Sequence, residues 1–263
     1  MVAVAPHASP LARPRVRRIH RADLHWALRE GLKDFLAKRG DIILIGVIYP
    51  VVMLIAATLS LGGAGFALWF PLTAGIALLG PIVAVGFYEL ARRREERRDA
   101  RWAHFLDPFR GPSGPAIMAL GVLLGVLFLL WMGVAWQIYR MTLGALQPAD
   151  LPTFIDQLFS TPEGWQLIVF GNLAGFVFAV ATLAITVVSF PLLVDRPVDV
   201  GSAVETSIRA TRQNPVEIGT WGLYVAIILV LGCIPLFVGL AVALPVLGYA
   251  SWHLYTRLVE RPA

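Results

Sequence analysis

Charged residues are scarce in this chain of 263 residues: they make up 15% of it, whereas hydrophobic residues make up 57%. Soluble domains carry roughly a quarter charged residues. The mean hydropathy of +0.71 points the same way. Composition alone therefore excludes an ordinary soluble domain and indicates a membrane protein.

Residues that bind metals or carry out catalysis are also few. Cys233 is the only cysteine, which excludes an internal disulfide and a cysteine-based zinc cluster. Haem and copper oxidase chemistry requires several histidines inside the membrane, but only His253 lies in an apolar stretch. The other histidines are His7, His20, His25 and His104.

Known catalytic and cofactor motifs are missing as well. The sequence contains no nucleophile elbow, Walker loop, zinc motif or dinucleotide fingerprint. We therefore predict no catalytic, cofactor-binding or metal-binding residues, no cofactor and no enzyme activity. Although the pI is about 9.8, the basic residues lie beside apolar stretches and not on a soluble domain, so nucleic acid is not an expected partner.

Long apolar runs are abundant. A transmembrane helix needs about 20 predominantly apolar residues. The fourth run is long for one crossing and is expected to bend or end near Pro191. Gly232 and Pro235 interrupt the last long run, as is typical of a tight helical hairpin. The predicted spans are 42–59, 69–90, 116–139, 165–193, 216–231 and 234–255.

The basic residues fix the predicted orientation of these spans. Every Lys and Arg except Arg140 falls on one side of them, and that side is the cytoplasmic one by the positive-inside rule. Residues 1–40 contain no apolar signal-peptide core. We predict a multi-pass protein of the bacterial inner (plasma) membrane with both termini in the cytoplasm. Residues 1–18, rich in Arg and Pro, are predicted to be a disordered basic tail, and 19–258 a six-helix transmembrane domain.

Amphipathic segments precede each of the three predicted hairpins and predict short helices that lie in the headgroup layer. The fold class expected is thus all-α, with six transmembrane helices arranged as three hairpins and short interfacial helices. A further stripe over 151–159 lies on the outer side, where Asp150 can cap the helix. The cytoplasmic stripes are Leu24, Leu28, Leu32, Phe35 and Leu36; Trp102, Phe105, Leu106 and Phe109; and Val204, Ile208 and Thr211.

An internal repeat relates the first and third hairpins. Residues 71–77 match 235–241, and the same offset aligns Glu89 with His253. Two interpretations of Glu89 stay open. It can be an interfacial carboxylate paired with Arg92 or Arg93, or it can form a polar relay with His253.

The arginine run that follows Glu89 also has two interpretations. It can act as a solvated topology anchor, or it can contact anionic lipid headgroups, at roughly 1 kcal/mol per basic residue near the surface. The candidates for headgroup contact are Arg92, Arg93, Arg94, Arg97 and Arg98.

Five further motifs are Phe70-Pro71-Leu72, Leu79-Gly80-Pro81, Gly86-Phe87-Tyr88-Glu89-Leu90, Ser189-Phe190-Pro191-Leu192-Leu193-Val194-Asp195-Arg196 and Trp252-His253-Leu254-Tyr255. Together they resemble the DUF2189 family of bacterial integral membrane proteins. The resemblance covers roughly 19–258 and implies no catalytic residues. The fourth motif is also similar to the membrane domain of some glycerophosphodiester phosphodiesterases. Some family members are labelled as cytochrome oxidase proteins, which implies at most an accessory role here.

The function that we predict is a non-enzymatic membrane scaffold or accessory protein. Its expected partners are the lipid bilayer, anionic headgroups and another membrane protein complex, such as a respiratory complex. The alternative is a small-solute or ion transporter that uses Glu89 and His253. An enzyme acting on lipids comes third.

Overall fold

The computed structural model describes residues 14–37, 71–72, 75, 78–148, 150–235 and 238–261. Within these ranges the regular elements are helices, so the predicted all-α class is confirmed there. The longer helices are α1 (Arg21–Ala37), α4 (Gly80–Glu95), α6 (Gly114–Met141), α7 (Leu151–Ser160), α8 (Pro162–Thr186), α10 (Val200–Gln213), α11 (Pro215–Cys233) and α12 (Leu240–Leu258). Two 3-10 turns (Trp102–His104, Leu143–Leu146) and the short helices α5 (Asp107–Arg110) and α9 (Ser189–Asp195) connect them.

Three helical stretches in the described residues are long and apolar enough to cross a membrane: α6, the run of α8 and α9, and α11. They correspond to the third, fourth and fifth predicted spans. Six transmembrane helices are not confirmed. The predicted span 42–59 lies outside the described residues, and the second and sixth predicted spans correspond in part to α4 and α12, which are not among the three.

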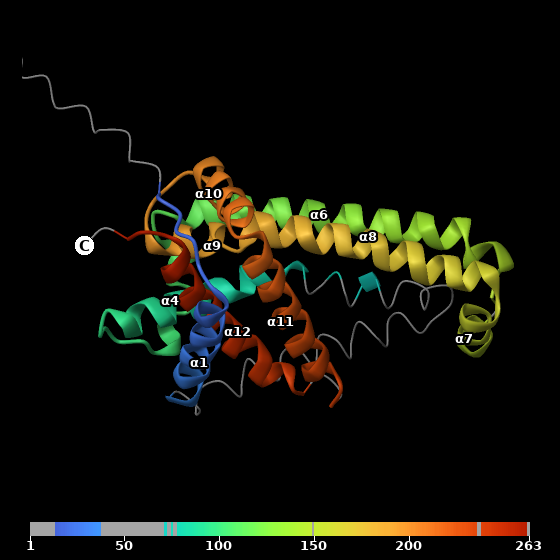
Figure 1. Cartoon of the computed structure of the whole chain (residues 1–263), viewed down its shortest axis with the longest axis horizontal. Coiled ribbons are helices and arrows are strands. Elements are labelled where there is room, and N and C mark those ends of the chain that lie inside the picture. The colour runs from blue at the N-terminus through green and yellow to red at the C-terminus, as the bar shows by residue number, and fades with distance from the viewer. Residues whose placement is uncertain are drawn as a thin grey trace, which may run out of the picture.

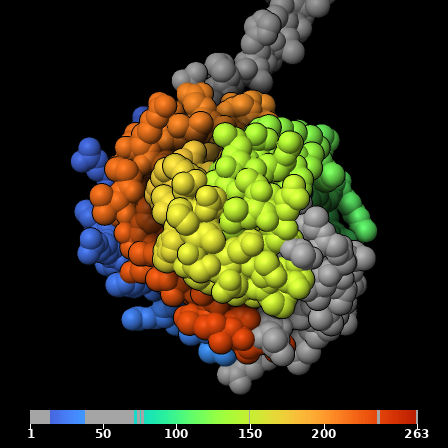
Figure 2. Space-filling model, turned by 90° about the vertical axis from the view of Figure 1, so that its right-hand side faces the viewer, coloured from blue at the N-terminus to red at the C-terminus, as the bar shows by residue number. Residues whose placement is uncertain are grey.

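The hairpin of α6 and α8 extends away from the other described helices, with α7 at its tip (Figure 1). Figure 2 looks at this tip and shows the two helices packed side by side. Large apolar side chains such as Leu129 and Phe176 point outward from it. An apolar exterior of this kind suits a lipid environment, where it does not need to be covered by protein.

The capping of α7 agrees with the sequence. Asp150 accepts a hydrogen bond from the backbone N–H of Thr153 at 2.8 Å, as an N-cap does. Phe154 and Leu158 then pack against Tyr139 and Leu143. Half of the predicted stripe therefore faces α6, while Ile155 and its neighbours on the other side stay exposed.

A break divides the long fourth run, as expected near Pro191. The helix α8 ends at Thr186 and α9 begins at Ser189. In a continuous helix the proline ring would clash with the carbonyl four residues before it; in the first turn of α9 its missing N–H costs nothing. The N–H of Val188, freed by the break, donates to the hydroxyl of Ser207 at 3.1 Å. This bond ties the break to α10.

The predicted tight hairpin between the last two runs is present. The helix α11 ends at Cys233, and α12 begins at Leu240, six residues later than the predicted span. A Cβ on Gly239 would come within 2.8 Å of the Cα of Gly232. Glycine at both positions allows the two chain segments to approach this closely.

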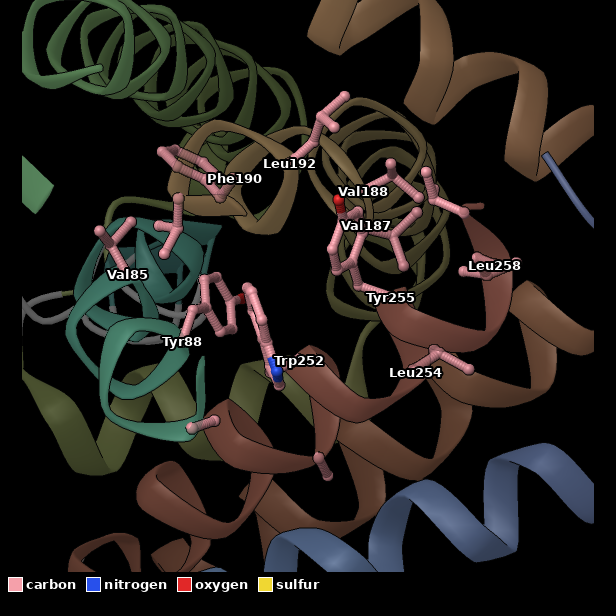
Figure 3. Close-up of a cluster of buried hydrophobic side chains, with 14 of the residues drawn as sticks. Val85, Tyr88, Val187, Val188, Phe190, Leu192, Trp252, Leu254, Tyr255 and Leu258 are labelled. Atoms are coloured by element: carbon pink, nitrogen blue, oxygen red, sulfur yellow. The ribbon is translucent and has the colours of Figure 1, made fainter. Parts of the chain in front are cut away.

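The main core lies where α4, α9 and α12 meet (Figure 3). From Ser189 to Val194 every residue of α9 is buried, as expected for a helix that is apolar all round. Phe87 of α4 stacks edge-on against Tyr249 of α12 and against Phe105. The predicted interfacial segment around Trp102 and Phe105 therefore packs on α4.

The helix α1 docks on α12 through a face that includes only part of the predicted stripe. Its buried residues are Leu24, Ala27, Gly31 and Asp34, whereas Leu32 of the predicted stripe is 44% exposed. The small residues Ala27 and Gly31 lie at the contact because they allow close approach of the two helices. Figure 1 shows α1 running across the direction of α6 and α8.

The helix α10 repeats this pattern. Its buried face consists of Ala203, Thr206, Ser207 and Ala210. The predicted stripe of Val204, Ile208 and Thr211 is only partly buried. In α10 small and hydroxyl side chains face the protein, and in α1 Leu24 of the predicted stripe is buried beside Ala27 and Gly31. That the exposed part of each stripe lies in the headgroup layer stays a prediction.

Residues 14–18, which fall in the predicted tail, make contacts with the rest of the chain before α1. Val16 forms an antiparallel bridge with Val259. Asn214, buried before α11, accepts a hydrogen bond from the N–H of Ile19 at 2.9 Å and donates one to the carbonyl of Arg17 at 3.1 Å. The bridge joins the two terminal segments, and Asn214 fastens residues 17–19 to the start of α11. Residues 1–13 lie outside the described residues.

Candidate functional site

The charged residues concentrate at one end of the molecule, which we call the charged end. It comprises α1, α5, α9, α10, the C-terminal turns of α4 and α12, and residues 14–20 and 259–261. Three clusters of ion pairs lie there, and each has a carboxylate that is almost fully buried. An isolated buried charge is costly, so each must be paired and hydrogen-bonded.

Glu89 forms the first cluster. Its side chain is 2% exposed and forms ion pairs with Arg92 at 2.7 Å and Arg93 at 2.6 Å. The spacing of three and four residues on α4 places these groups on one face. Arg93 also forms an ion pair with Asp107 at 2.8 Å, and the carboxylate of Asp107 lies 2.7 Å from Nδ1 of His104. The cluster thereby fastens the 102–110 connection to α4.

Asp34 forms the second cluster, in the interface of α1 with α12 and α4. Its carboxylate lies 2.8 Å from Nε2 of His253 and 3.0 Å from Nε of Arg94. Trp26 packs edge-on against the His253 ring. The guanidinium group of Arg257 lies over the ring of Trp26, 4.0 Å from the ring centre. These contacts fix how α1 sits on α12.

Asp195 forms the third cluster, at the end of α9. It accepts hydrogen bonds from the hydroxyl of Tyr255 at 2.8 Å and from Nε of Arg261 at 3.1 Å. Arg261 also forms an ion pair with Glu95 at 2.8 Å. Burial disfavours the charge of Arg261, but the hydrogen bonds and charges of Glu95 and Asp195 outweigh it, so the pKa of this guanidinium lies above its ordinary value.

A cavity of about 210 Å³ opens between the first and third clusters. Its walls come from the end of α4, from α5, from the start of α6 at Ser113 and from the 193–197 segment. The charged groups that line it are balanced in sign: Glu89, Asp107 and Asp195 with Arg92, Arg93 and Arg196. Because these groups pair with each other, the cavity has no excess of either charge.

The structure separates the two residues of the predicted relay. Glu89 pairs with Arg92 and Arg93, as the first interpretation expected, while His253 pairs with Asp34. Within the described residues no hydrogen bond joins the two clusters. Each residue fastens a different neighbour to the core.

The five candidate arginines for headgroup contact fall into two groups. Arg92 and Arg93 are mostly buried in the first cluster, and Arg94 pairs with Asp34. Arg97 and Arg98 lie beyond the end of α4 and are exposed. Arg98 makes only a surface pair with Glu96, which leaves these two free to meet an external anion.

Sequence reasoning missed Asp34 and Asn214, which are buried, and Asp195, which is partly buried. A signal existed for Asp34, which recurs at helical spacing with Ala27 and Gly31 and so shares their face. No local pattern marks Asp195 or Asn214, since their partners lie far away in the sequence. Among the described residues no group of His, Cys, Asp or Glu could hold a metal ion.

Comparison with known proteins gives one family. Residues 69–195 match the family model "Predicted integral membrane protein (DUF2189)". The resemblance expected over 19–258 is therefore supported over this part, which contains the second to fourth predicted spans, and with the apolar helices it identifies a predicted integral membrane protein. No curated protein and no solved structure matches the chain, so the similarity to glycerophosphodiester phosphodiesterases has no support.

Proposed function

We propose that this protein is a non-enzymatic membrane scaffold or accessory protein of the bacterial inner membrane, with its charged end in the cytoplasm. In this proposal it holds anionic lipids and another membrane complex together through that end. One observation carries the proposal: the buried ionisable groups of the charged end pair with each other, while Arg97 and Arg98 remain exposed beside them.

Pairing of this kind suits a rigid binding surface. Ion pairs between buried groups hold α1, α4, α9 and α12 in one arrangement and offer no free base or acid to a substrate. Exposed arginines near the membrane attract anionic headgroups, at roughly 1 kcal/mol each. The separate partners of Glu89 and His253 give no support to the alternative of a transporter that relays protons between them.

Lipid retention tests the first half of the proposal. The double variant Arg97→Gln/Arg98→Gln should retain less phosphatidylglycerol than the unaltered protein, because its binding free energy for the lipid falls by roughly 2 kcal/mol in total. Native mass spectrometry after purification in mild detergent measures the bound lipid. Arg140→Gln, at the far end of α6, removes a charge without touching the charged end and serves as the control. Equal retention by the double variant and the unaltered protein would refute the lipid contact.

Co-purification tests the second half. The tagged protein, extracted from its native membrane in mild detergent, should bring down a membrane partner in stoichiometric amount. The orientation is checked separately, because a cysteine at position 98 should be protected from a membrane-impermeant thiol reagent in intact cells. A lone particle that moves a solute across liposomes would favour transport instead.

A further inference from the structure

The outward face of α8 carries a polar group where lipid is expected. Asn172 is exposed on this face, among apolar neighbours such as Val169 and Phe176, the latter 66% exposed. Its position is ten residues into α8 from Pro162, or about 15 Å along the helix axis. That is about half of the roughly 30 Å hydrocarbon thickness, so Asn172 lies near the middle of the bilayer.

The amide of Asn172 is only partly satisfied. Its Nδ2 donates to the carbonyl of Ile168 at 2.7 Å. Among the residues that the structure describes, no group donates to its Oδ1. Lipid tails offer no hydrogen bonds, and a polar group left unpaired in hydrocarbon costs free energy. A partner for this amide is therefore expected outside the described contacts.

We infer that the partner is a second copy of this chain, so that the protein self-associates through the α8 face centred on Asn172. A side-chain amide is self-complementary, because it carries both donors and an acceptor. Across a two-fold axis each Asn172 can donate its remaining N–H to the Oδ1 of the other, and a two-fold interface uses the same patch on both copies. The described part of this face carries no charge that would repel a copy.

The surroundings of Asn172 suit close helix packing. Gly171 lies next to it, and a Cβ there would meet no atom within 4 Å. Small residues let transmembrane helices approach closely enough for side-chain hydrogen bonds to form. Gly175, three residues after Asn172 and so on a neighbouring stripe of α8, packs against Trp131 of α6. The inferred interface therefore borders the α6–α8 contact, with Val169 and Phe176 on its outward side.

Dilution in liposomes tests this inference. Copies labelled with donor and acceptor dyes should show energy transfer that falls as the lipid-to-protein ratio rises. Asn172→Leu should weaken the association about three- to tenfold, the range expected for interhelical hydrogen bonds, and Asn172→Gln should restore part of it. Gln137→Leu, which removes an exposed amide from α6, should leave it unchanged.

Cross-linking locates the interface independently. In a Cys233→Ala background, Phe176→Cys on the inferred face should give disulfide-linked dimers on oxidation, while Phe178→Cys, beside Trp131, should not. Transfer that persists unchanged in Asn172→Leu, monomers at every dilution, or cross-links to a different protein in native membranes would each overturn the inference. Thermal unfolding of each variant confirms that it is folded.

Discussion

The charged end and the α6–α8 hairpin are both built from helices, but opposite rules decide what they bury. In the hairpin, α6 buries only a narrow seam of residues, and neighbours such as Leu129 face outward, 67% exposed. At the charged end, α9 is buried all round and even Glu89 is enclosed. Where lipid is the solvent an apolar surface needs no cover, whereas a buried carboxylate needs its partners wherever it lies.

This contrast implies that the two regions should respond differently to the same kind of substitution. A change at the charged end should cost stability in proportion to the pairing or packing that is lost. A change on the outer face of the hairpin should cost little, since the side chain exchanges one apolar environment for another. Four paired experiments test this contrast.

The largest difference is expected between Glu89 in α4 and Glu96 just after its end. Glu89→Ala should destabilise the protein by about 3–5 kcal/mol, because it leaves the mostly buried Arg92 without its ion pair and Arg93 with Asp107 alone. Glu96→Ala removes only a surface pair with Arg98 and should cost less than about 1 kcal/mol. Thermal or denaturant unfolding in detergent micelles measures both. Equal losses would mean that the burial of Glu89 has no energetic consequence.

Two leucines of α6 provide the next comparison. Leu124 is fully buried in the seam, whereas Leu129 faces outward. Leu124→Ala should cost about 2–4 kcal/mol through the lost contacts and the cavity left behind, and Leu129→Ala should cost less than about 0.5 kcal/mol. The same unfolding assay applies. A large loss for Leu129→Ala would show that protein, and not lipid, covers that face.

The α1–α12 contact gives a smaller effect. A Cβ at position 31 would lie 2.6 Å from the backbone nitrogen of Ala250, so Gly31→Ala must push the two helices apart and should cost about 1–3 kcal/mol. Gly219→Ala, on α11, meets open space and should be neutral or slightly stabilising, since alanine favours helix. Protease cleavage at Arg29 should rise only in the first variant. Unchanged cleavage in both would contradict the tight docking of α1.

The smallest effect concerns pH. Hydrogen bonds from Ser202 lower the pKa of Asp199, the N-cap of α10. Because the folded pKa lies below the unfolded value, the cap stabilises α10 above the ordinary Asp range, near 3.9, and this contribution is lost as the pH falls through the folded pKa. Amide exchange of residues 200–203, corrected for intrinsic rates, should therefore accelerate at acid pH.

The matched control for this measurement is Asp199→Asn, because asparagine also caps helices but does not titrate. Its amide exchange, after the same correction, should not change over this pH range. If the variant shows the same acid acceleration as the unaltered protein, a group other than Asp199 is responsible.

The sequence by itself determined the features that depend on local patterns. Apolar runs predicted α6, α8 and α11, Pro191 predicted the break before α9, and the Gly232–Pro235 interval predicted the turn into α12. Spacing along one helix also allowed the pairing of Glu89 with Arg92 or Arg93, one of the two interpretations that the sequence left open. These features share a cause, since each arises from residues within a few turns of one another.

Only the tertiary structure decided which face of each amphipathic helix docks and which partners the buried polar groups have. The apolar stripe with Leu32 was the stronger pattern in α1, yet close approach to Ala250 favours the face with Gly31. His253 and Asp34 lie 219 positions apart, and the sequence does not encode their pairing locally. Such contacts depend on how helices cross, because the geometry of the crossing fixes which distant side chains can meet.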